Sequence, residues 1–303
     1  SRQNPAAYAV RTSHESTSSS GGALASLSLK WLNDGGCVFG AAFDPAMNVV
    51  HVKADSEEKL IRLATSKYVQ SNLDGIFFQV RDALSSGQKV MFVGTPCQVA
   101  GLRSAIGVND DLLTVQLACH GVPSAKIWKE YLHSLQALWG AKILSVNFRD
   151  KSRGWKNYHV AYTTSSGITR VPFNKDTYML AYLQNLSLRP SCYNCRFRSS
   201  ACADLMAGDL WNASHLLKEY DDARGFTLLC ALTSAGAKAI DGLTNESGAV
   251  CIPVDYSSAV KGNSGFGAAI DMPQRREDFF DGIYDADDLL AHMDRFVERK
   301  SSG

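Results

Sequence analysis

The stretch KVMFVGTPCQ, residues 89–98, decides the fold class of this chain. Its first half is a continuous apolar run of the length of a buried strand, and a glycine turn follows at once. A short helical segment then leads to a second run of the same kind, LLTVQLA at 112–118, which ends in CHGVP at 119–123. Two buried strands joined by a helix with short links are typical of a parallel or mostly parallel α/β sheet.

The segments on the C-terminal side extend this pattern and then change it. Ser124 is in position to cap a helix with apolar side chains at helical spacing, and a third strand is predicted at 143–148. After Asp150 the pattern gives a predicted hairpin, a cysteine-bearing loop at 187–202 and an amphipathic helix at 285–300. The later segments therefore mix helices with hairpin strands.

The predicted organisation has two parts. We predict an α/β fold with a mostly parallel sheet flanked by helices, and a smaller mixed α+β part that carries the cysteine-rich loop. The change of pattern sets a soft boundary between residues 1–150 and residues 151–303. No internal repeat accompanies this division.

The composition excludes several classes of protein. The chain has 303 residues, of which 45% are hydrophobic and 20% are charged, as expected for a globular protein. Its formal net charge of +1 provides no global field for nucleic acid or an anionic membrane. No apolar run reaches the roughly 20 residues of a membrane span, and the first residues hold no apolar signal core. We therefore predict a cytoplasmic protein. Because it begins without Met, we expect a trimmed chain or a fragment.

The chain has eight cysteines. We do not expect them to form structural disulfides, because a chain of this length does not need them and no export signal places it in an oxidising compartment. Cys37, Cys230 and Cys251 each stand alone in apolar segments, where cysteine packs as a small hydrophobe. Cys97 and Cys119 instead follow the ends of the two buried strands. In an open α/β sheet, ligands bind outside the carboxyl ends of strands, so both thiols are expected at one edge.

A second pair, Cys192 and Cys195, forms a C-x-x-C motif. That spacing suits half of a zinc site, a redox dithiol or a pair of cluster ligands. Together with Cys97 and Cys119 the pair makes four thiolates, the set that a cubane iron–sulfur cluster requires, and Cys202 is a reserve ligand. Zinc in the same four thiolates remains the physical competitor.

Other features point to anionic ligands. SSSGGA at 18–23 opens a predicted helix and suits a phosphate, although Ser and Gly before a helix often form only a cap. No G-x-G-x-x-G or P-loop motif occurs. From Arg149 to Arg198 there are nine Lys or Arg and two Asp, which favours an anionic cofactor or substrate, or an acidic electron carrier. His120, beside Cys119, is a candidate proton donor.

Six motifs in order carry a family resemblance. They are SSSGGA (18–23), SKYVQS (66–71), VGTPCQVAGL (93–102), ACHGVPS (118–124), FRDKSRGW (148–155) and CYNCRF (192–197) with GDLW (208–211). Together they resemble the coenzyme F-420 hydrogenase/dehydrogenase beta subunit family in its bacterial branch. The resemblance runs from about Ala7 to about Phe280.

The resemblance implies a flavin, usually FAD, close to a 4Fe-4S cluster, with residues 1–150 as the flavin-binding part. The implied cluster ligands are the same four cysteines, Cys97, Cys119, Cys192 and Cys195. The implied cofactor-binding residues are Ser20, Gly21, Gly22, Lys67, Tyr68, Gly94 and Thr95. FRDKS would belong to the substrate or cofactor side, so we predict Arg149 and Lys151, together with His120, as catalytic or substrate-binding residues. Arg196 and Arg198, which follow the C-x-x-C pair, are expected to dock an electron carrier.

Two departures from the family pattern stand out. Bacterial members often carry an N-terminal ferredoxin-like module with C-x-x-C repeats, and this sequence has none. The GSKY of many relatives reads Thr65-Ser66-Lys67-Tyr68 here, without the glycine.

Two hypotheses for function follow. The first is an oxidoreductase that passes electrons between a 4Fe-4S cluster, FAD and a small anionic or deazaflavin-like substrate, with a ferredoxin-like carrier or a fused module as partner. Some relatives belong to surface-polysaccharide metabolism, which is a candidate setting. The alternative is a non-catalytic binding module of the same fold, with zinc or without cofactor.

Overall fold

The structure is a computed structural model that describes residues 4–284 and 288–299, except 201 and 221. The strands of a large sheet are β1 (Ala6–Arg11), β2 (Cys37–Phe43), β3 (Val49–Ala54), β4 (Val90–Gly94), β5 (Leu112–Leu117), β9 (Leu205–Asp209), β10 (Thr227–Ala231) and β11 (Val250–Val254). A smaller sheet holds β6 (Ile143–Asp150), β7 (His159–Thr164) and β8 (Gly167–Pro172).

Helices surround both sheets. The α-helices are α1 (Ala23–Asn33), α2 (Glu57–Leu63), α3 (Ile76–Ser85), α4 (Pro96–Ile106), α5 (Ala125–Trp139), α6 (Thr177–Leu183), α7 (Pro190–Tyr193), α8 (Ala213–Leu216), α9 (Ser234–Thr244), α10 (Tyr256–Val260), α11 (Arg276–Phe280) and α12 (Leu289–Asp294). Three 3-10 turns are η1 (Glu15–Thr17), η2 (Lys218–Tyr220) and η3 (Ser264–Phe266). Part of the predicted C-terminal helix, 285–287 and 300, lies outside the described residues.

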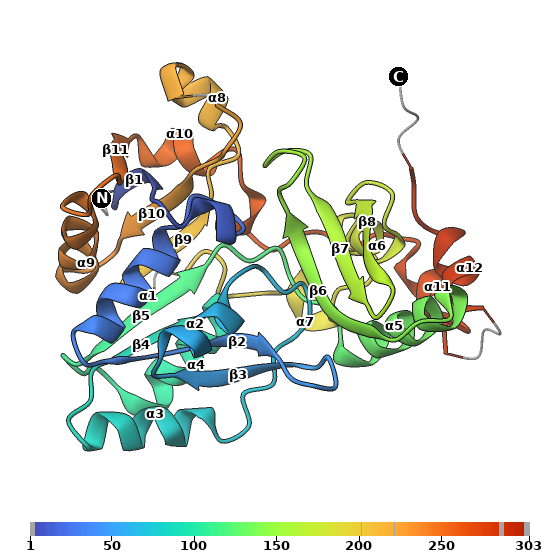
Figure 1. The fold of residues 1–303 in the computed structure, drawn as a ribbon, viewed down its shortest axis with the longest axis horizontal. Coiled ribbons are helices and arrows are strands. Elements are labelled where there is room, and N and C mark those ends of the chain that lie inside the picture. Colours follow the sequence, from blue (N-terminus) through green and yellow to red (C-terminus); the bar gives the residue numbers. More distant parts are fainter. Residues whose placement is uncertain (1–3, 201, 221, 285–287, 300–303) are drawn as a thin grey trace.

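The large sheet has the order β11-β1-β10-β9-β5-β4-β2-β3, with a parallel centre and antiparallel flanks (Figure 1). Strands β2, β4, β5 and β9 are parallel neighbours, whereas β3 on one side and β10, β1 and β11 on the other run antiparallel to their neighbours. The predicted α/β class is therefore confirmed, and the sheet as a whole is mixed.

Helices cover both faces of this sheet, as the alternation of its side chains requires. Leu27 of α1, Leu60 of α2 and Ile240 of α9 share one core with the inward side chains of the central strands. Val80 of α3 and Leu102 of α4 belong to the core on the opposite face. The sheet is thus buried on both sides, which explains why β4 and β5 read as continuous apolar runs in the sequence.

The predicted third strand does not belong to the large sheet. Strand β6 pairs with β7 in the separate antiparallel sheet, and β9 takes the place beside β5. The side chains of β6 alternate between buried and exposed only in part, and Phe148 packs with Trp128 of α5 and Tyr178 of α6. Helix α12 packs against α5 and α6, although it is distant in sequence (Figure 1).

The change of pattern near residue 150 does not separate the two sheets. Strands β9, β10 and β11 come after the small sheet and return to the large one. Strand β1, which sequence analysis missed, lies between β10 and β11 and joins the two ends of the chain. Among the described residues, no helix is long and apolar enough to cross a membrane.

Candidate functional site

Cys97 and Cys119 lie at the same edge of the large sheet, as predicted. Strands β4 and β5 are parallel, and their register brings Gly94 opposite Gln116 just before the two turns. Thr95 caps α4, and its Oγ1 lies 3.2 Å from the Sγ of Cys97 in the first turn of that helix. Cys97 is exposed and Cys119 is half-buried. The carboxyl edge of the parallel strands therefore presents both thiols.

The C-x-x-C loop is fastened to the turn that follows Cys119. The amide of Arg189 donates to the carbonyl of Val122 at 3.0 Å, and Pro123 forms a β-bridge with Leu188. Gly121 has a φ of +131°, and a side chain there would meet the Cβ of Cys192 at 3.3 Å and Leu188 at 2.8 Å. The absence of a side chain at this position thus allows the loop to approach the Cys119 turn.

The four predicted ligands influence one another electrostatically. Burial raises the pKa of Cys119 to about 12, and the neighbouring Cys97 and Cys192 raise it further. Burial also raises the pKa of Cys192, with contributions from Cys97 and Cys195. These influences place Cys97 and Cys192 close to Cys119, and Cys195 close to Cys192. The two predicted pairs therefore lie together, and we call these four residues the cysteine site.

Within the described ranges, no group of three or more His, Cys, Asp or Glu side chains is placed to hold a metal ion. Four cysteine side chains are the donor set both of a tetrahedral zinc site and of a four-iron cluster.

The fifth nearby cysteine is turned to other partners. The Sγ of Cys202 lies 3.6 Å from the carbonyl oxygen of Pro96 and 3.5 Å from the Oε1 of Gln116. Cys202 therefore stands beside the Cys97 turn. Cys37 and Cys230 are buried and Cys251 is half-buried, in keeping with their predicted packing role.

A second group of motif residues gathers around Arg149, at the end of β6. Arg149 is 2% exposed, and its guanidinium lies 4.1 Å from the ring centre of Tyr158 and 4.7 Å from that of Trp211. A guanidinium nitrogen is 3.5 Å from the carboxylate of Asp209. Burial opposes the charge, but Asp209 and the phenol of Tyr68 outweigh it and raise the pKa of Arg149. Arg149 is thus a fixed buried cation, and its role toward a substrate stays a prediction.

Arg149 and Lys151 hold the SSSGG loop in place. The guanidinium of Arg149 donates to the carbonyl of Ser19 at 3.3 Å. The ammonium of Lys151 donates to the carbonyl of Ser20 at 2.8 Å and to that of Glu15 at 2.5 Å. Burial lowers the pKa of Lys151 to about 8. The structure therefore brings FRDKS and SSSGG together, although more than 120 residues separate them in the sequence.

The glycines of this loop serve the packing of the protein itself. A side chain on Gly21 would stand 2.2 Å from the carbonyl oxygen of Val10 and 2.6 Å from the amide of Thr227, so the loop lies directly on β1 and β10. Gly22 caps α1 with a φ of +86°. The hydroxyl of Ser20 donates to the carbonyl of Phe226 at 2.8 Å. Ser20, Gly21 and Gly22 thus each have a role in the packing of the loop, and their predicted contact with a cofactor stays a prediction.

Lys67 also has a structural role where a flavin contact was expected. Its ammonium donates to four carbonyls at the end of α2, at distances between 2.7 and 3.1 Å. Burial lowers the pKa of Lys67 to about 7. Thr65, which stands where many relatives have glycine, has a φ of +66°, a left-handed conformation that glycine adopts more easily. The departure from GSKY therefore falls on a strained turn.

Aromatic side chains link the cysteine site to the group around Arg149. The ring of Tyr182 lies 5.1 Å from that of His120 and 4.8 Å from that of Tyr68. Both Cys119 and Tyr68 act electrostatically on Tyr182, which shows that it stands between the two groups. No sequence signal indicated Tyr182, since its place in α6 reads as an ordinary core position.

His120 is held as a neutral ring. Its Nε2 lies 2.6 Å from the Oδ1 of Asn185, and burial lowers its pKa. With Nε2 engaged, its other ring nitrogen is the one free to exchange a proton with a ligand. The predicted proton-donor role of His120 stays a prediction.

Two buried nitrogens next to Trp211 have no hydrogen-bond partner among the described residues. They are the Nε of Arg149, whose guanidinium lies 4.7 Å from the ring centre of Trp211, and the Nε1 of Trp155, whose ring stacks on Trp211 at 4.6 Å. Buried polar atoms normally find partners, so these two atoms are unusual.

Arg196 and Arg198, which we predicted to dock an electron carrier, differ in their exposure to solvent. Arg196 is exposed, as expected for a docking residue. Arg198 is 3% exposed and donates to the carbonyl of Ser264. The prediction of a docking role for Arg198 is therefore wrong, because the C-x-x-C loop folds this side chain inward.

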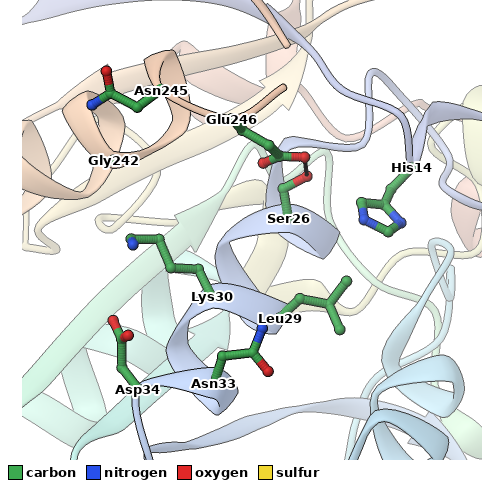
Figure 2. Close-up of a pocket in the computed structure, with 9 residues that line it drawn as sticks. All are labelled: His14, Ser26, Leu29, Lys30, Asn33, Asp34, Gly242, Asn245 and Glu246. Carbon is green, nitrogen blue, oxygen red and sulfur yellow. Dashed lines mark hydrogen bonds between the residues drawn. The ribbon is translucent and has the colours of Figure 1, made fainter. Parts of the chain in front are cut away.

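The described cavities lie elsewhere. A groove of about 460 Å³ runs between α1 and α9, where the hydroxyl of Ser26 donates to Glu246 at 2.9 Å (Figure 2). A second hollow of about 260 Å³ lies beside α5 and the start of α6. Neither includes any residue predicted to bind a cofactor, metal or substrate.

Comparison with known proteins decides the family. Residues 87–253 match the family described as the C terminus of the beta subunit of coenzyme F420 hydrogenase/dehydrogenase. The chain belongs to this family. The matched range includes all four predicted cluster cysteines and the FRDKS and GDLW motifs, whereas SSSGGA and SKYVQS precede it. No curated protein matches the sequence.

A solved structure confirms the fold. The chain is similar to one in the xenon-derivatised F420-reducing [NiFe] hydrogenase complex from Methanosarcina barkeri, with a TM-score of 0.57 and 18% identity over 84% of each chain. The resemblance inferred from the six motifs is thus confirmed at the level of the family. Membership relates this chain to the beta subunits of redox enzymes.

Proposed function

We propose that this member of the F420 hydrogenase/dehydrogenase beta subunit family is an oxidoreductase that uses a 4Fe-4S cluster and a flavin, usually FAD in the family. Its substrate would be a small anionic or deazaflavin-like molecule. The observation that carries the proposal is the convergence of Cys97, Cys119, Cys192 and Cys195 on one rim, from two strand ends and one loop.

The chemistry of the four cysteine donors suits a thiolate-ligated cluster. The four thiols come from two rigid turns and a fastened loop, and their mutual influence shows that they are close. When bound, such a cluster carries single electrons, and a flavin exchanges single-electron for hydride chemistry. The chain would hold the four thiolates in place, and the buried surroundings of Cys119 would keep water away from the cluster.

The flavin would be held by a set of side chains that includes Tyr68 from the expected set but not Lys67, Ser20 or Gly21. Lys67, Ser20 and Gly21 are occupied by internal contacts. Half-buried residues that border Arg149 offer aromatic faces and polar groups: Ser66, Tyr68, Lys151, Asp209 and Trp211. Aromatic rings suit a planar cofactor, and the fixed charge of Arg149 suits an anionic one.

Proton transfer to a substrate would fall to His120. Its ring lies beside Tyr182, between the cysteine site and Tyr68, and Asn185 orients it. A neutral imidazole in this position would accept a proton through its free nitrogen and return it, while Lys151, with a pKa lowered to about 8, would remain the nearby cation.

The test replaces single ligands. Cys192→Ser and Cys195→Ser should each lose the cluster, because a hard oxygen replaces a soft thiolate. The matched control is Cys230→Ser, in which a buried thiol of packing type is replaced. Iron and acid-labile sulfide are measured after anaerobic reconstitution. Full iron retention in both loop variants, or equal loss in the control, would contradict the assignment.

The alternative is a non-catalytic module that holds zinc or no cofactor. The observation in its favour is that Lys67, Ser20 and Gly21 already have partners within the chain. Metal analysis of the same preparations distinguishes the two functions, since zinc binding without flavin would support the module.

A further inference from the structure

Arg198 is a buried cation without a counter-charge among the described residues. Its side chain leaves 3% of the residue exposed, and one terminal nitrogen donates to the carbonyl of Ser264. The Nε and the other terminal nitrogen have no hydrogen-bond partner in the described part of the chain. Burying an unpaired charge costs several kcal/mol, so the arrangement requires an anion that is not part of the polypeptide described here.

The position of Arg198 relates it to the cysteine site. Ser264, which accepts from Arg198, begins the turn η3, and the next residue, Gly265, accepts the amide of Cys119 at 3.1 Å. The same short turn therefore fixes both the guanidinium and the Cys119 backbone. The charge of Arg198 also acts on Cys119 and on His120. Arg198 and Cys119 are therefore held close together by adjacent carbonyls of the η3 turn.

Other buried arginines show what is unusual here. Arg11 is 6% exposed and pairs with Asp222 at 2.6 Å. Arg149 has Asp209. Arg198 forms no ion pair with any residue in the described ranges, although it is as buried as these. A cation that is buried, unpaired and close to Cys119 has its natural partner in the negative charge of a thiolate-ligated centre.

We propose that Arg198 is the counter-cation of the cysteine site, a positioning residue that raises the reduction potential of the cluster bound there. The proposal rests on the function proposed above. Reduction adds one electron and makes the cluster more negative, and a nearby buried cation stabilises the more negative form. Hydrogen bonds and charge near the sulfurs are the established means by which a protein sets such a potential.

The first test measures the potential of reconstituted protein by electron paramagnetic resonance during titration with dithionite. Arg198→Met should shift the ratio of oxidised to reduced cluster at least tenfold toward the oxidised form at a given potential. That shift equals about 59 mV for a one-electron couple. Arg198→Lys should keep most of the wild-type potential because it keeps the charge.

Arg196→Met is the matched control. It removes the same charge two residues away, but Arg196 is exposed, so solvent and salt screen it and the shift should be small. Arg198→Met at the wild-type potential, or Arg196→Met with an equal shift, would overturn the proposal. Wild-type protein that takes up no iron would overturn the proposed function itself, and with it the role of Arg198.

A second measurement needs no cluster. In metal-free protein Arg198→Met should unfold at the same temperature as wild type or higher, because it removes a buried charge that lacks a partner. After cluster loading, the variant should gain less stability than wild type does. A metal-free variant that unfolds at a lower temperature, or fails to fold, would show that the charge is already satisfied and would refute the proposal.

Discussion

At the scale of single residues, buried polar side chains connect the motifs. Arg149 and Lys151 donate hydrogen bonds to the carbonyls of Ser19 and Ser20. The buried charge of Arg198 acts on Cys119. His51 contacts the strand that leads into the Cys97 turn. Its ring nitrogens lie 2.7 Å from the hydroxyl of Ser71 and 3.0 Å from the carbonyl of Val93 in β4. The position of the motif residues therefore depends on buried polar side chains around them.

His51 predicts a loss of stability in mild acid. Burial lowers its pKa to about 4, against 6.5 for an ordinary histidine, although the bond to Val93 opposes the shift. The unfolded chain then binds more protons than the folded chain below about pH 6.5. Stability that is complete above that pH should fall by about 3 kcal/mol as the pH approaches 4.

The free energy of urea unfolding, measured at intervals between about pH 7 and pH 4, checks this. His51→Gln should be less stable at neutral pH but should show a smaller loss across the interval, since it has no proton to gain. Parallel pH profiles for variant and wild type would mean that His51 does not control this loss.

At the scale of elements, periodicity predicted most helices and strands but not their partners. The Ser124-capped helix, the hairpin and both apolar strands are confirmed as α5, β7–β8, β4 and β5. The 143–148 strand was assigned to the wrong sheet because a strand's local sequence does not specify its neighbour, and β9 occupied that place. Strand β1 was missed because AAYAVR is short and rich in alanine, which has low strand propensity.

The same limit applies to Lys67, whose motif suggested a ligand contact. The residue type and position were evident, but the four carbonyls at the end of α2 that accept its protons were not. The cysteine site was predictable because strand ends and a C-x-x-C spacing locate thiols without knowledge of side-chain partners. Arg149, Lys67 and Arg198 depend on such partners.

Lys67→Met should destabilise the cofactor-free protein by about 2 kcal/mol, since charged hydrogen bonds to the end of a helix are lost. The exposed Lys59 of α2, which pairs with Asp55 just before that helix at 2.7 Å, provides the control, and Lys59→Met should cost at most about 0.5 kcal/mol. Urea unfolding measures both. If Lys67→Met leaves the unfolding free energy unchanged but weakens flavin binding, Lys67 contacts the cofactor and not α2.

At the scale of the whole molecule, the site lies where the two sheets meet. Cys97 and Cys119 come from the carboxyl edge of the large sheet, and Arg149 lies near the end of strand β6 in the small sheet. The ring of Tyr182 lies between these two groups. The excess of positive charge between Arg149 and Arg198 overstates the field at the surface. Arg149 and Arg198 are buried, and Arg170 pairs with Asp150 at 3.2 Å.

The most direct test of the account is the cofactor content of the intact chain after anaerobic purification and reconstitution. Iron, acid-labile sulfide, zinc and flavin are measured on one sample with its absorbance spectrum. The account predicts about four irons and about four sulfides per chain, together with bound flavin. About one zinc per chain, without sulfide or flavin, would contradict it.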